Sequence, residues 1–386
     1  MERLKRRFRD ESVSVYTISG DPCDTLKQYV VSTRDTRDLM NYPEIVSVGF
    51  RRKMRNGITN ALKGISRLED LSRLDSRKVN VFHILRGALN FEIVSALNRA
   101  FGYKWQSSSY ISSQRVLKEG SFEVSDDLYR KFVVPDEATI YSCDIVASGI
   151  SLDNALRYLD AYMESSDCRI RNLVFITIGC GEAARVLRKW DKIFREKCPG
   201  YERTILCYLE GRFALASDDT PLENFSPDTD LLKSSRLGAL ISPEFEYSQF
   251  EKMIIALEAC VIYDGGKKGF EPLNHINEIL EFWERQLESA RKKNISLWEE
   301  YNLRFPLEDY FEDIENLSPG SSGILMEKKK NLWRGVSSKE YAELYGKFKW
   351  LWEDPRIQGA LRAGSLAGVC EKKIKYLRSL YREGSF

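Results

Sequence analysis

A short apolar stretch runs into a turn of small and polar residues at positions 139–151, with the sequence Thr-Ile-Tyr-Ser-Cys-Asp-Ile-Val-Ala-Ser-Gly-Ile-Ser. Ser148 and Ser151 offer hydroxyl donors, and Gly149 lets the backbone come close to a ligand. A segment of helical periodicity follows, so the stretch predicts a strand, a tight loop and a helix N-terminus. Such a junction binds phosphate, because free backbone N–H groups and the positive end of the helix point at one place. Asp144, just before the loop, is placed to bind ribose hydroxyls.

This pattern resembles the 5-phosphoribosyl-1-pyrophosphate (PRPP) signature of type I phosphoribosyltransferases. In that signature an apolar run, an acidic pair and two apolar residues precede a Thr/Ser-Gly-x-Thr/Ser loop. The resemblance implies that Asp144 binds the ribose as the catalytic carboxylate and acts indirectly toward the metal. It also implies a 5-phosphate site formed by Ala147, Ser148, Gly149, Ile150 and Ser151. Cys143 departs from the family pattern, because it stands where the first acid of the pair is expected.

A second strand–turn–helix pattern lies upstream. Residues 79–85 predict a buried strand, and apolar residues at helical spacing follow in 88–101. The turn between them contains Arg86 and Gly87. A similar Arg-Gly turn holds the pyrophosphate of PRPP in type I phosphoribosyltransferases, so the resemblance implies that Arg86 and Gly87 bind pyrophosphate and that Arg86 is catalytic. A guanidinium suits a polyphosphate because it is a planar fork that stays charged and bonds two oxygens.

Residues 105–111 resemble the strand that leads into the family's mobile loop, where a Ser-Tyr pair precedes a flexible segment. Ser109 and Tyr110 match that pair, and the polar, charged segment 112–130, with Arg115, is expected to form the loop itself. A lid that closes over the reacting centre excludes water, which would otherwise hydrolyse PRPP. An ordinary surface loop would have the same composition.

The pattern along the middle of the chain alternates between strands and helices and predicts an α/β fold. We expect strands at 79–85, 105–111, 139–143, 172–178 and 204–209, and helices at 88–101, 152–164 and 181–196. Near-continuous apolar strands between amphipathic helices favour a parallel sheet covered on both faces. Ligands of such sheets collect at the carboxyl ends of the strands, so the motif segments are expected to converge on one crevice. The resemblance names this a Rossmann-like, type I phosphoribosyltransferase fold.

Three regions are expected along the chain. Residues 1–75 form an N-terminal segment that would contribute to a hood over the active site, residues 76–245 the phosphoribosyltransferase-like core, and residues 246–386 a mainly α-helical extension. The loop at 210–235 is rich in Pro and Asp, and its position along the chain resembles the nucleobase loop of enzymes near uracil phosphoribosyltransferase. Asp228 and Asp230 are therefore candidates for binding the acceptor, although an acidic surface loop has the same composition.

The apolar and aromatic residues of the C-terminal region are expected to pack onto the domain, whereas the size of the region suggests a specialised acceptor or partner. An apolar stripe at helical spacing runs from Ile276 to about Trp298. Residues 318–323, Ser-Pro-Gly-Ser-Ser-Gly, are typical of a linker or long turn, and the segment beyond them is rich in basic and aromatic residues. That composition also occurs in nucleic-acid-binding segments, but the helical spacing of the aromatics favours packing onto the domain.

Composition excludes several classes of function. The chain has 59 Lys and Arg against 57 Asp and Glu, which gives no overall attraction to nucleic acid or to an anionic membrane. No long apolar run or signal-peptide pattern is present, so a cytoplasmic protein is expected. Eight scattered cysteines form no Cys-x-x-Cys pair, which argues against a zinc site or a disulfide framework. The two histidines, His83 and His275, are expected to be structural.

The resemblance implies a transferase that displaces pyrophosphate from C1 of PRPP by a ring nitrogen of a nucleobase or related heterocycle. The transition state would be oxocarbenium-like, with Mg²⁺ and cations placed where charge develops on the pyrophosphate. Mg²⁺ would take most of its oxygen ligands from PRPP and water. Enzymes for 6-oxopurines usually have an aspartate where this chain has Ala147, which lowers the expectation of hypoxanthine or guanine salvage without naming the acceptor. A homodimer is common in the family.

Two other classes stay open. One is a regulatory protein of the same fold that binds PRPP or a nucleotide without turnover, an alternative that Cys143 favours. The other is a different phosphate-binding α/β protein, such as a hydrolase of a phosphorylated sugar, for which Asp144 is the only obvious water-activating acid.

Overall fold

The structure is a computed structural model that describes residues 3–19, 25–85, 87–118, 121–217, 220, 230–234, 237–251, 259–264, 271–304 and 355–383. Two predicted site residues, Arg86 and Asp228, lie outside the described residues. None of the helices in the described part of the chain is both long and apolar enough to cross a membrane.

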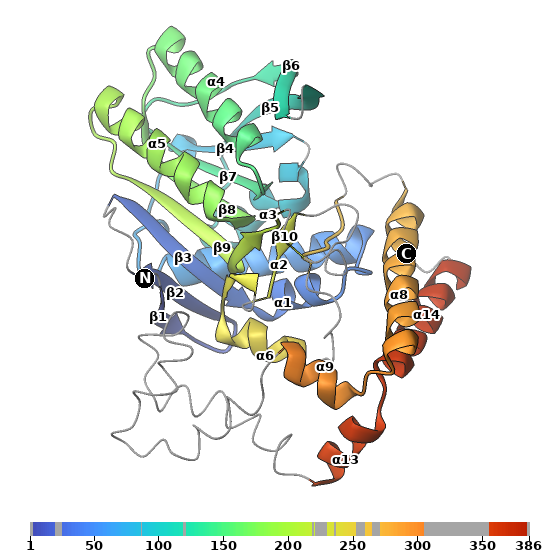
Figure 1. The fold of residues 1–386 in the computed structure, drawn as a ribbon. Helices are drawn as coiled ribbons and strands as arrows, with labels where there is room; N and C mark the ends of the chain where they lie inside the picture. Colours follow the sequence, from blue (N-terminus) through green and yellow to red (C-terminus); the bar gives the residue numbers. More distant parts are fainter. Residues whose placement is uncertain are drawn as a thin grey trace.

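A mixed β-sheet forms the centre of the molecule (Figure 1). Its middle is parallel, in the order β3 (Leu26–Thr33), β9 (Arg203–Leu215), β8 (Ile170–Cys180), β7 (Ala138–Val146), β4 (Val79–Leu85) and β5 (Ser107–Lys118). Antiparallel strands extend it at the edges: β1 (Arg3–Arg9) and β2 (Val13–Ser19) beside β3, β6 (Ser121–Lys131) beside β5, and the short β10 (Leu231–Leu232) and β11 (Leu240–Ile241) on β9.

The prediction of a parallel sheet is therefore right for the middle and wrong for the edges. A parallel pair needs a crossover connection, whereas a tight hairpin can only join antiparallel strands. Short connections join β1 to β2 and β5 to β6, so these pairs are antiparallel. The five strands expected from the sequence are all present, with ends that differ by a few residues.

Two helical layers cover the sheet (Figure 1). On one face, α4 (Ile150–Ser166) and α5 (Gly181–Lys197) pack against alternate strand residues such as Phe82 and Phe175. On the other face lie α1 (Arg34–Asn41), α2 (Ser47–Ile65) and α3 (Ile93–Phe101), over residues such as Val81 and Ile176. Side chains alternate along a strand, so each parallel strand contributes apolar side chains to the clusters on both faces of the sheet. This is why the sequence of each strand is almost continuously apolar.

The helix predicted at 88–101 is divided into two pieces. A 3-10 helix, η2 (Gly87–Phe91), precedes α3, and Glu92 between them has a φ of 53°. A left-handed residue cannot continue a right-handed helix, so the chain changes direction there. The Glu92 carboxylate forms an ion pair with Arg51 of α2, which ties the junction to the neighbouring helix.

The N-terminal segment extends the sheet. Residues of β3 pair in parallel with β9, and α2 packs in the same apolar cluster as β4 and β7. A second short 3-10 helix, η1 (Ser76–Lys78), leads directly into β4. The expected boundary at residue 75 thus falls within a continuous core, and the role of residues 1–75 as a hood stays a prediction.

The described part of the C-terminal region is helical and joins the α2 layer. It contains α6 (Pro243–Glu251), α8 (Pro272–Lys293), α9 (Leu297–Arg304), α13 (Pro355–Ala363) and α14 (Leu366–Glu383), and α8 lies beside α14 (Figure 1). The apolar stripe predicted from Ile276 onward is buried against the core, which confirms its packing role. His275 is buried and its ring Nε2 donates a hydrogen bond of 2.7 Å to the carbonyl oxygen of Pro43, so it is structural as expected.

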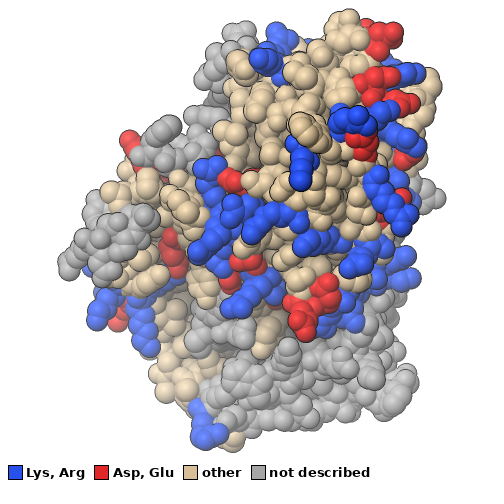
Figure 2. All heavy atoms as spheres, turned by 180° about the vertical axis from the view of Figure 1, so that it is seen from behind, with Lys and Arg blue, Asp and Glu red and all other residues tan. Residues whose placement is uncertain are grey.

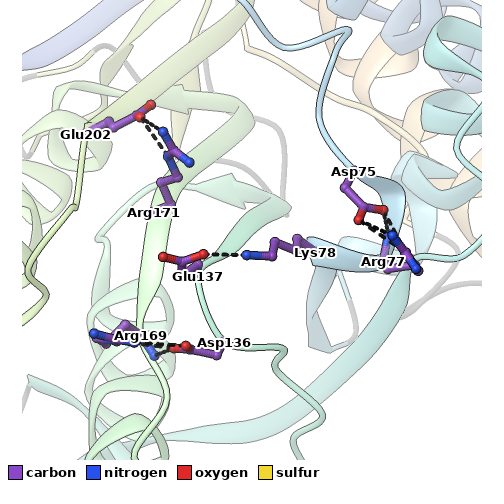
Figure 3. A network of polar contacts seen from close by, with 8 residues as sticks. All are labelled: Asp75, Arg77, Lys78, Asp136, Glu137, Arg169, Arg171 and Glu202. Atoms are coloured by element: carbon purple, nitrogen blue, oxygen red, sulfur yellow. Dashed lines mark hydrogen bonds and ion pairs between the residues drawn. The ribbon is translucent and has the colours of Figure 1, made fainter.

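Ion pairs link the amino ends of neighbouring strands (Figure 3). Lys78 before β4 pairs with Glu137 before β7, Arg169 pairs with Asp136 at 2.9 Å, and Arg171 in β8 pairs with Glu202 before β9 at 2.5 Å. Arg77 and Asp75 form a further pair at 2.8 Å. These side chains are exposed to solvent to a large extent, so each ion pair contributes little to stability. At the amino edge of the sheet, each of these cations therefore has an acid beside it.

Candidate functional site at the carboxyl edge of the sheet

The strand order places the two phosphate motifs side by side. From β4 the chain crosses to β5 on one side, whereas β7 pairs with β4 on the other side. The order of connections therefore reverses between β4 and β7, and in open α/β sheets this switch point opens a crevice at the carboxyl ends of the strands. The turn at Gly87 follows β4, and the loop at 147–149 follows β7. Both predicted motifs lie at this point.

The loop after β7 has the predicted strand–loop–helix form. β7 ends at Val146 and α4 begins at Ile150, with Gly149 as the N-cap residue at a φ of 76°. Glycine adopts this left-handed conformation without the steric penalty of a Cβ atom. Gly149 has no side chain with which to cap α4, so the first N–H groups of this helix are available for a ligand. The other loop positions, Ala147, Ser148 and Ser151, are half-buried.

A shallow hollow of about 10 Å³ lies against this loop and is lined by Asp144, Ile145, Val146, Ala147, Ser148, Gly149, Ser151 and Leu152. That volume admits roughly one water molecule, so a phosphate group would rest on the loop rather than enter a deep cavity. Residues at the start of α5 contact the backbone of the loop. Cys180 Sγ lies 3.0 Å from the carbonyl oxygen of Ala147, and α5 packs against Gly149.

Asp144 connects the two motifs. Its side chain is 8 % exposed, and its Oδ1 accepts a hydrogen bond of 2.8 Å from the backbone N–H of Ile145. Thr177 of β8 donates to the backbone carbonyl of Asp144 at 2.8 Å, which fixes this part of β7. A Cβ atom placed on Gly87 would lie far inside the van der Waals distance of Asp144 Oδ1. The Gly87 turn and the Asp144 carboxylate are thus in direct contact.

Cys143 cannot replace the missing acid. Its side chain is 1 % exposed and belongs to the apolar cluster on the α2 and α3 face of the sheet. Burial raises the pKa of this thiol well above its usual value, so it is uncharged at neutral pH. Of the two positions, only Asp144 has a carboxylic acid side chain.

The segment expected to be a mobile loop is a β-hairpin. β5 runs to Lys118 and pairs antiparallel with β6 through most of its length. Ser109 is fully buried, and its Oγ accepts hydrogen bonds from Asn80 Nδ2 at 3.1 Å and from the backbone N–H of Val133 at 3.0 Å. Ser109 is therefore a strand residue with a structural role. Arg115 belongs to β5, but its side chain lies outside the described residues; closure of the hairpin over the site stays a prediction.

His83 was expected to be only structural, yet it has an unusual environment. It lies in β4, four positions before Gly87, and its ring stacks on Tyr110 of β5 with centroids 4.7 Å apart. The side chain is 7 % exposed, and neither ring nitrogen has a hydrogen-bond partner in the described structure. Burial lowers the pKa of His83 from 6.5 to about 4, so the ring is neutral at physiological pH. Its place in an apolar strand was visible in the sequence, but the missing partners were not.

A second polar cluster, which the sequence did not indicate, occupies the same edge at β3 and β9. Glu210 is completely buried, with a φ of 65° at an irregularity of β9. Its carboxylate accepts hydrogen bonds from the backbone N–H of Thr33 at 2.9 Å, from Thr36 Oγ1 and from Ser242 Oγ at 3.1 Å. Thr33 also caps α1, so this cluster fixes the start of that helix.

Glu210 gives a testable pH dependence. Burial is the main cause that raises the pKa of this carboxyl above its ordinary 4.5, so ionisation is less favourable in the folded than in the unfolded chain. Folding stability is then lost as pH rises from about 4.5 through the raised pKa. We expect the melting temperature of Glu210→Gln, measured relative to wild type, to increase as the pH rises above 4.5 and to level off once the pH exceeds the raised pKa. The control is Glu281→Gln, at an exposed glutamate of α8. If the melting temperatures of both variants depend on pH in the same way, burial does not raise the pKa of Glu210.

Of the two predicted acceptor residues, Asp230 is described by the structure and Asp228 is not. Asp230 is exposed, and its backbone carbonyl accepts a hydrogen bond of 2.7 Å from the N–H of Ala216, just after β9. It lies at the carboxyl edge of the sheet, but β8 and β9 separate it from β7. Among the described residues no group of three or more His, Cys, Asp or Glu side chains could hold a metal ion by itself. Among the described residues that were predicted at the switch point, Asp144 is the carboxylic acid.

No family model and no curated protein matches this chain. Solved structures with partial likeness include a protein from Aquifex aeolicus, with 14 % identity and a TM-score of 0.34 over 47 % of this chain and 84 % of that one. Hypoxanthine-guanine phosphoribosyltransferases are also among these structures. The enzyme from L. donovani has 13 % identity and a TM-score of 0.27 over 42 % and 82 %, and that from Bacillus anthracis has 16 % and 0.23 over 33 % and 67 %. Likeness of this size carries no functional weight, and the site is assigned from the chain's own residues.

Proposed function

We propose that this protein is a PRPP-dependent phosphoribosyltransferase that transfers the 5-phosphoribosyl group to a nucleobase or related nitrogen heterocycle and releases pyrophosphate. One observation supports this above all: the Gly87 turn touches the Asp144 carboxylate at the switch point of the sheet. PRPP carries a 5-phosphate, a ribose and a pyrophosphate. The site offers an uncapped helix N-terminus, a carboxylate and a glycine turn in the matching order.

Each element has a role that follows from its chemistry. The N–H groups at the start of α4 and the hydroxyls of Ser148 and Ser151 would bind the 5-phosphate. Asp144 would accept hydrogen bonds from the ribose hydroxyls and stabilise the positive charge that develops on the sugar ring. The backbone at Gly87, which has no Cβ to obstruct it, would approach the pyrophosphate closely. Arg86 would neutralise the charge that grows on the leaving group.

Magnesium would arrive with PRPP. Mg²⁺ prefers hard oxygen ligands and keeps several of its waters, so one carboxylate and the substrate's own oxygens suffice. Asp144 fits this role because it is a carboxylate in contact with the turn that would hold the pyrophosphate. When bound, the ion would supply charge neutralisation at the pyrophosphate.

A second function has a specific observation in its favour. Cys143 is buried and uncharged where the family has an acid, which leaves one carboxylate for ribose and metal. A protein of this kind would bind PRPP or a nucleotide and regulate a partner without turnover. Binding alone does not separate the two functions, whereas release of pyrophosphate does.

The test is calorimetric titration of PRPP with Mg²⁺ into the wild type and into Asp144→Asn and Ser148→Ala. We expect micromolar binding by the wild type and a loss of about tenfold or more in each variant, because Ser148→Ala removes a hydrogen bond to the charged 5-phosphate and Asp144→Asn removes the charged acceptor of the ribose hydroxyls. Matched controls lie at the other end of α4. Ser165→Ala and Asp167→Asn make the same chemical changes far from the loop, and Asn tolerates the left-handed conformation of Asp167, whose φ is 47°.

The outcomes separate the functions. Binding that is lost in the two site variants but kept in the controls supports the site, and pyrophosphate release with any nitrogen heterocycle then supports the transferase. Binding without release across a panel of purines, pyrimidines and simpler heterocycles would favour the regulatory function. Absence of PRPP binding by folded wild-type protein would overturn both.

A further inference from the structure

A cavity of about 470 Å³ lies between α2 and α3, away from the switch point. Its lining consists of Arg55, Val94, Ser95, Asn98, Arg99, Tyr103, Lys104 and Gln106. Arg55 comes from α2, four of the residues come from α3, and the last three come from the segment that leads into β5. The volume is in the range of small-molecule sites and far exceeds that of the hollow at the phosphate loop.

The charge of the lining is one-sided. Three of the eight side chains are cations, Arg55, Arg99 and Lys104, and none is acidic. This contrasts with the chain as a whole, which is almost neutral, and with the amino edge of the sheet, where each cation has an acid beside it. Figure 2, which views the molecule from behind, shows Lys and Arg across the middle of that side, with Asp and Glu side chains also present among them. Three like charges around one hollow repel one another, and an anion between them removes that repulsion.

Two polar atoms in the wall are buried without a partner in the described structure. They are Nε of Arg55 and Oε1 of Gln106. Gln106 is held in place because its amide Nε2 donates to the carbonyl oxygen of Val94 at 3.1 Å. Arg99 bonds only the neutral Asn56, at 2.8 Å, so its charge is not compensated there. A buried donor without an acceptor is costly, and a bound phosphate oxygen would supply that acceptor to Arg55.

The remaining wall suits more than a bare anion. Val94 is 39 % exposed and the buried ring of Tyr103 forms part of the lining. Trp105, between two lining residues in sequence, is 74 % exposed. Amides and a hydroxyl, from Asn98, Gln106 and Ser95, complete the cavity. Cations beside an apolar wall with a few hydrogen-bonding groups are the features that bind a phosphate joined to an organic part.

We propose that this cavity is a second ligand site, independent of the PRPP site, that binds a polyphosphate of nucleotide size. The cations hold the phosphates, and the wall at Val94 and Tyr103 accommodates the organic part. The shared chemistry is a chain of phosphates, which a nucleoside triphosphate and inorganic tripolyphosphate both present. Comparing the binding of these two compounds therefore distinguishes a nucleotide ligand from an inorganic polyphosphate.

The test combines calorimetry with site-resolved hydrogen exchange, using ATP and tripolyphosphate as probes. We expect ATP to bind the wild-type protein and to slow amide exchange within residues 93–106. Arg99→Glu with Lys104→Glu should weaken binding by at least about tenfold, since it replaces two attractive charges by repulsive ones. Lys192→Glu with Lys372→Glu is the matched control, because it makes the same charge change at exposed lysines of α5 and α14.

The two sites are read separately. The proposal is supported if either probe slows amide exchange in residues 93–106 of the wild type and of the control but not of the variant with Arg99→Glu and Lys104→Glu. The probe that binds more tightly then indicates whether the ligand is a nucleotide or an inorganic polyphosphate. Exchange that slows only around 144–151, or equal weakening in the pocket variant and the control, would overturn it. Failure of PRPP to bind in the calorimetric test of the proposed function would count against that function and leave the proposal for this cavity unaffected.

Discussion

Replacing Gly87 by alanine should weaken PRPP binding by about a hundredfold or more while the fold is retained. The new Cβ would overlap Asp144 Oδ1, and its distance to Asp144 Cγ would be 3.3 Å, so the carboxylate has to move. Asp144 is 8 % exposed and bonded to the N–H of Ile145, which leaves it little freedom to move without loss of that bond. One methyl group would then disturb the ribose contact and the pyrophosphate turn together, each worth a factor of about ten or more. Calorimetric titration with PRPP and Mg²⁺ measures the effect.

Gly359→Ala is the matched control. It lies in α13, and a Cβ atom there meets nothing within 4 Å. Alanine is a better helix former than glycine, so this change should leave PRPP binding intact and stability equal or slightly higher. If Gly87→Ala binds PRPP as tightly as the control does, the turn and Asp144 do not share a ligand.

The second large effect concerns pH and stability. The folded-state pKa of His83 is about 4, below the value of 6.5 for an exposed histidine. Between these values the unfolded chain binds a proton that the folded chain rejects, so stability is present above pH 6.5 and falls toward pH 4. A difference of this size corresponds to about 3 kcal/mol. His83→Phe keeps the stack on Tyr110 and removes the titrating ring together with its two unpartnered nitrogens.

The measurement is the unfolding free energy in urea at pH 7.5, 6.0 and 5.0 for both proteins. We expect the Phe variant to be at least as stable as wild type at pH 7.5, because an unpartnered buried polar group is replaced by an apolar one of similar shape. Its advantage should then grow as the pH falls. His275 is present in both proteins, so the difference isolates His83. If the difference in unfolding free energy between the two proteins does not change with pH, then the pKa of His83 is the same in the folded and unfolded chains.

Local patterns in the sequence predicted the parallel strands and the helices that follow them. The loop at 147–151 and the start of α4 lie within one contiguous stretch, so Gly149 and the apolar run before it were sufficient evidence. The strands β1 to β3 and their pairing with β9 were not predicted. Residues 26–33 pair with residues some 180 positions later, and periodicity carries no information about the partner of a strand. The break at Glu92 was missed because a left-handed glutamate has no sequence signature.

In the candidate site, too, features that depend on local sequence were predicted, and contacts between distant segments were not. Asp144 could be identified from its place before the loop, whereas its contact with Gly87 depends on the order of β4 and β7 in the sheet. Glu210 was assigned to the loop at 210–235, whereas it is buried in β9, and its partner Thr33 comes from a strand that is distant in the sequence. The cavity between α2 and α3 had no sequence signal, since its cations come from three separate segments.

The position of α14 has a consequence for how the chain is made. Buried residues of α14, among them Cys370 and Leu377, lie in the same cluster as the buried side of α8, and Lys373 pairs with Glu44 across 329 positions of sequence. Contacts of such high sequence separation form slowly, because a long stretch of chain must be ordered before they can stabilise it. On the ribosome, the apolar stripe of α8 emerges well before the helix that covers it. A chain that ends before Leu366 should therefore leave the side of α8 that contacts α14 exposed to solvent.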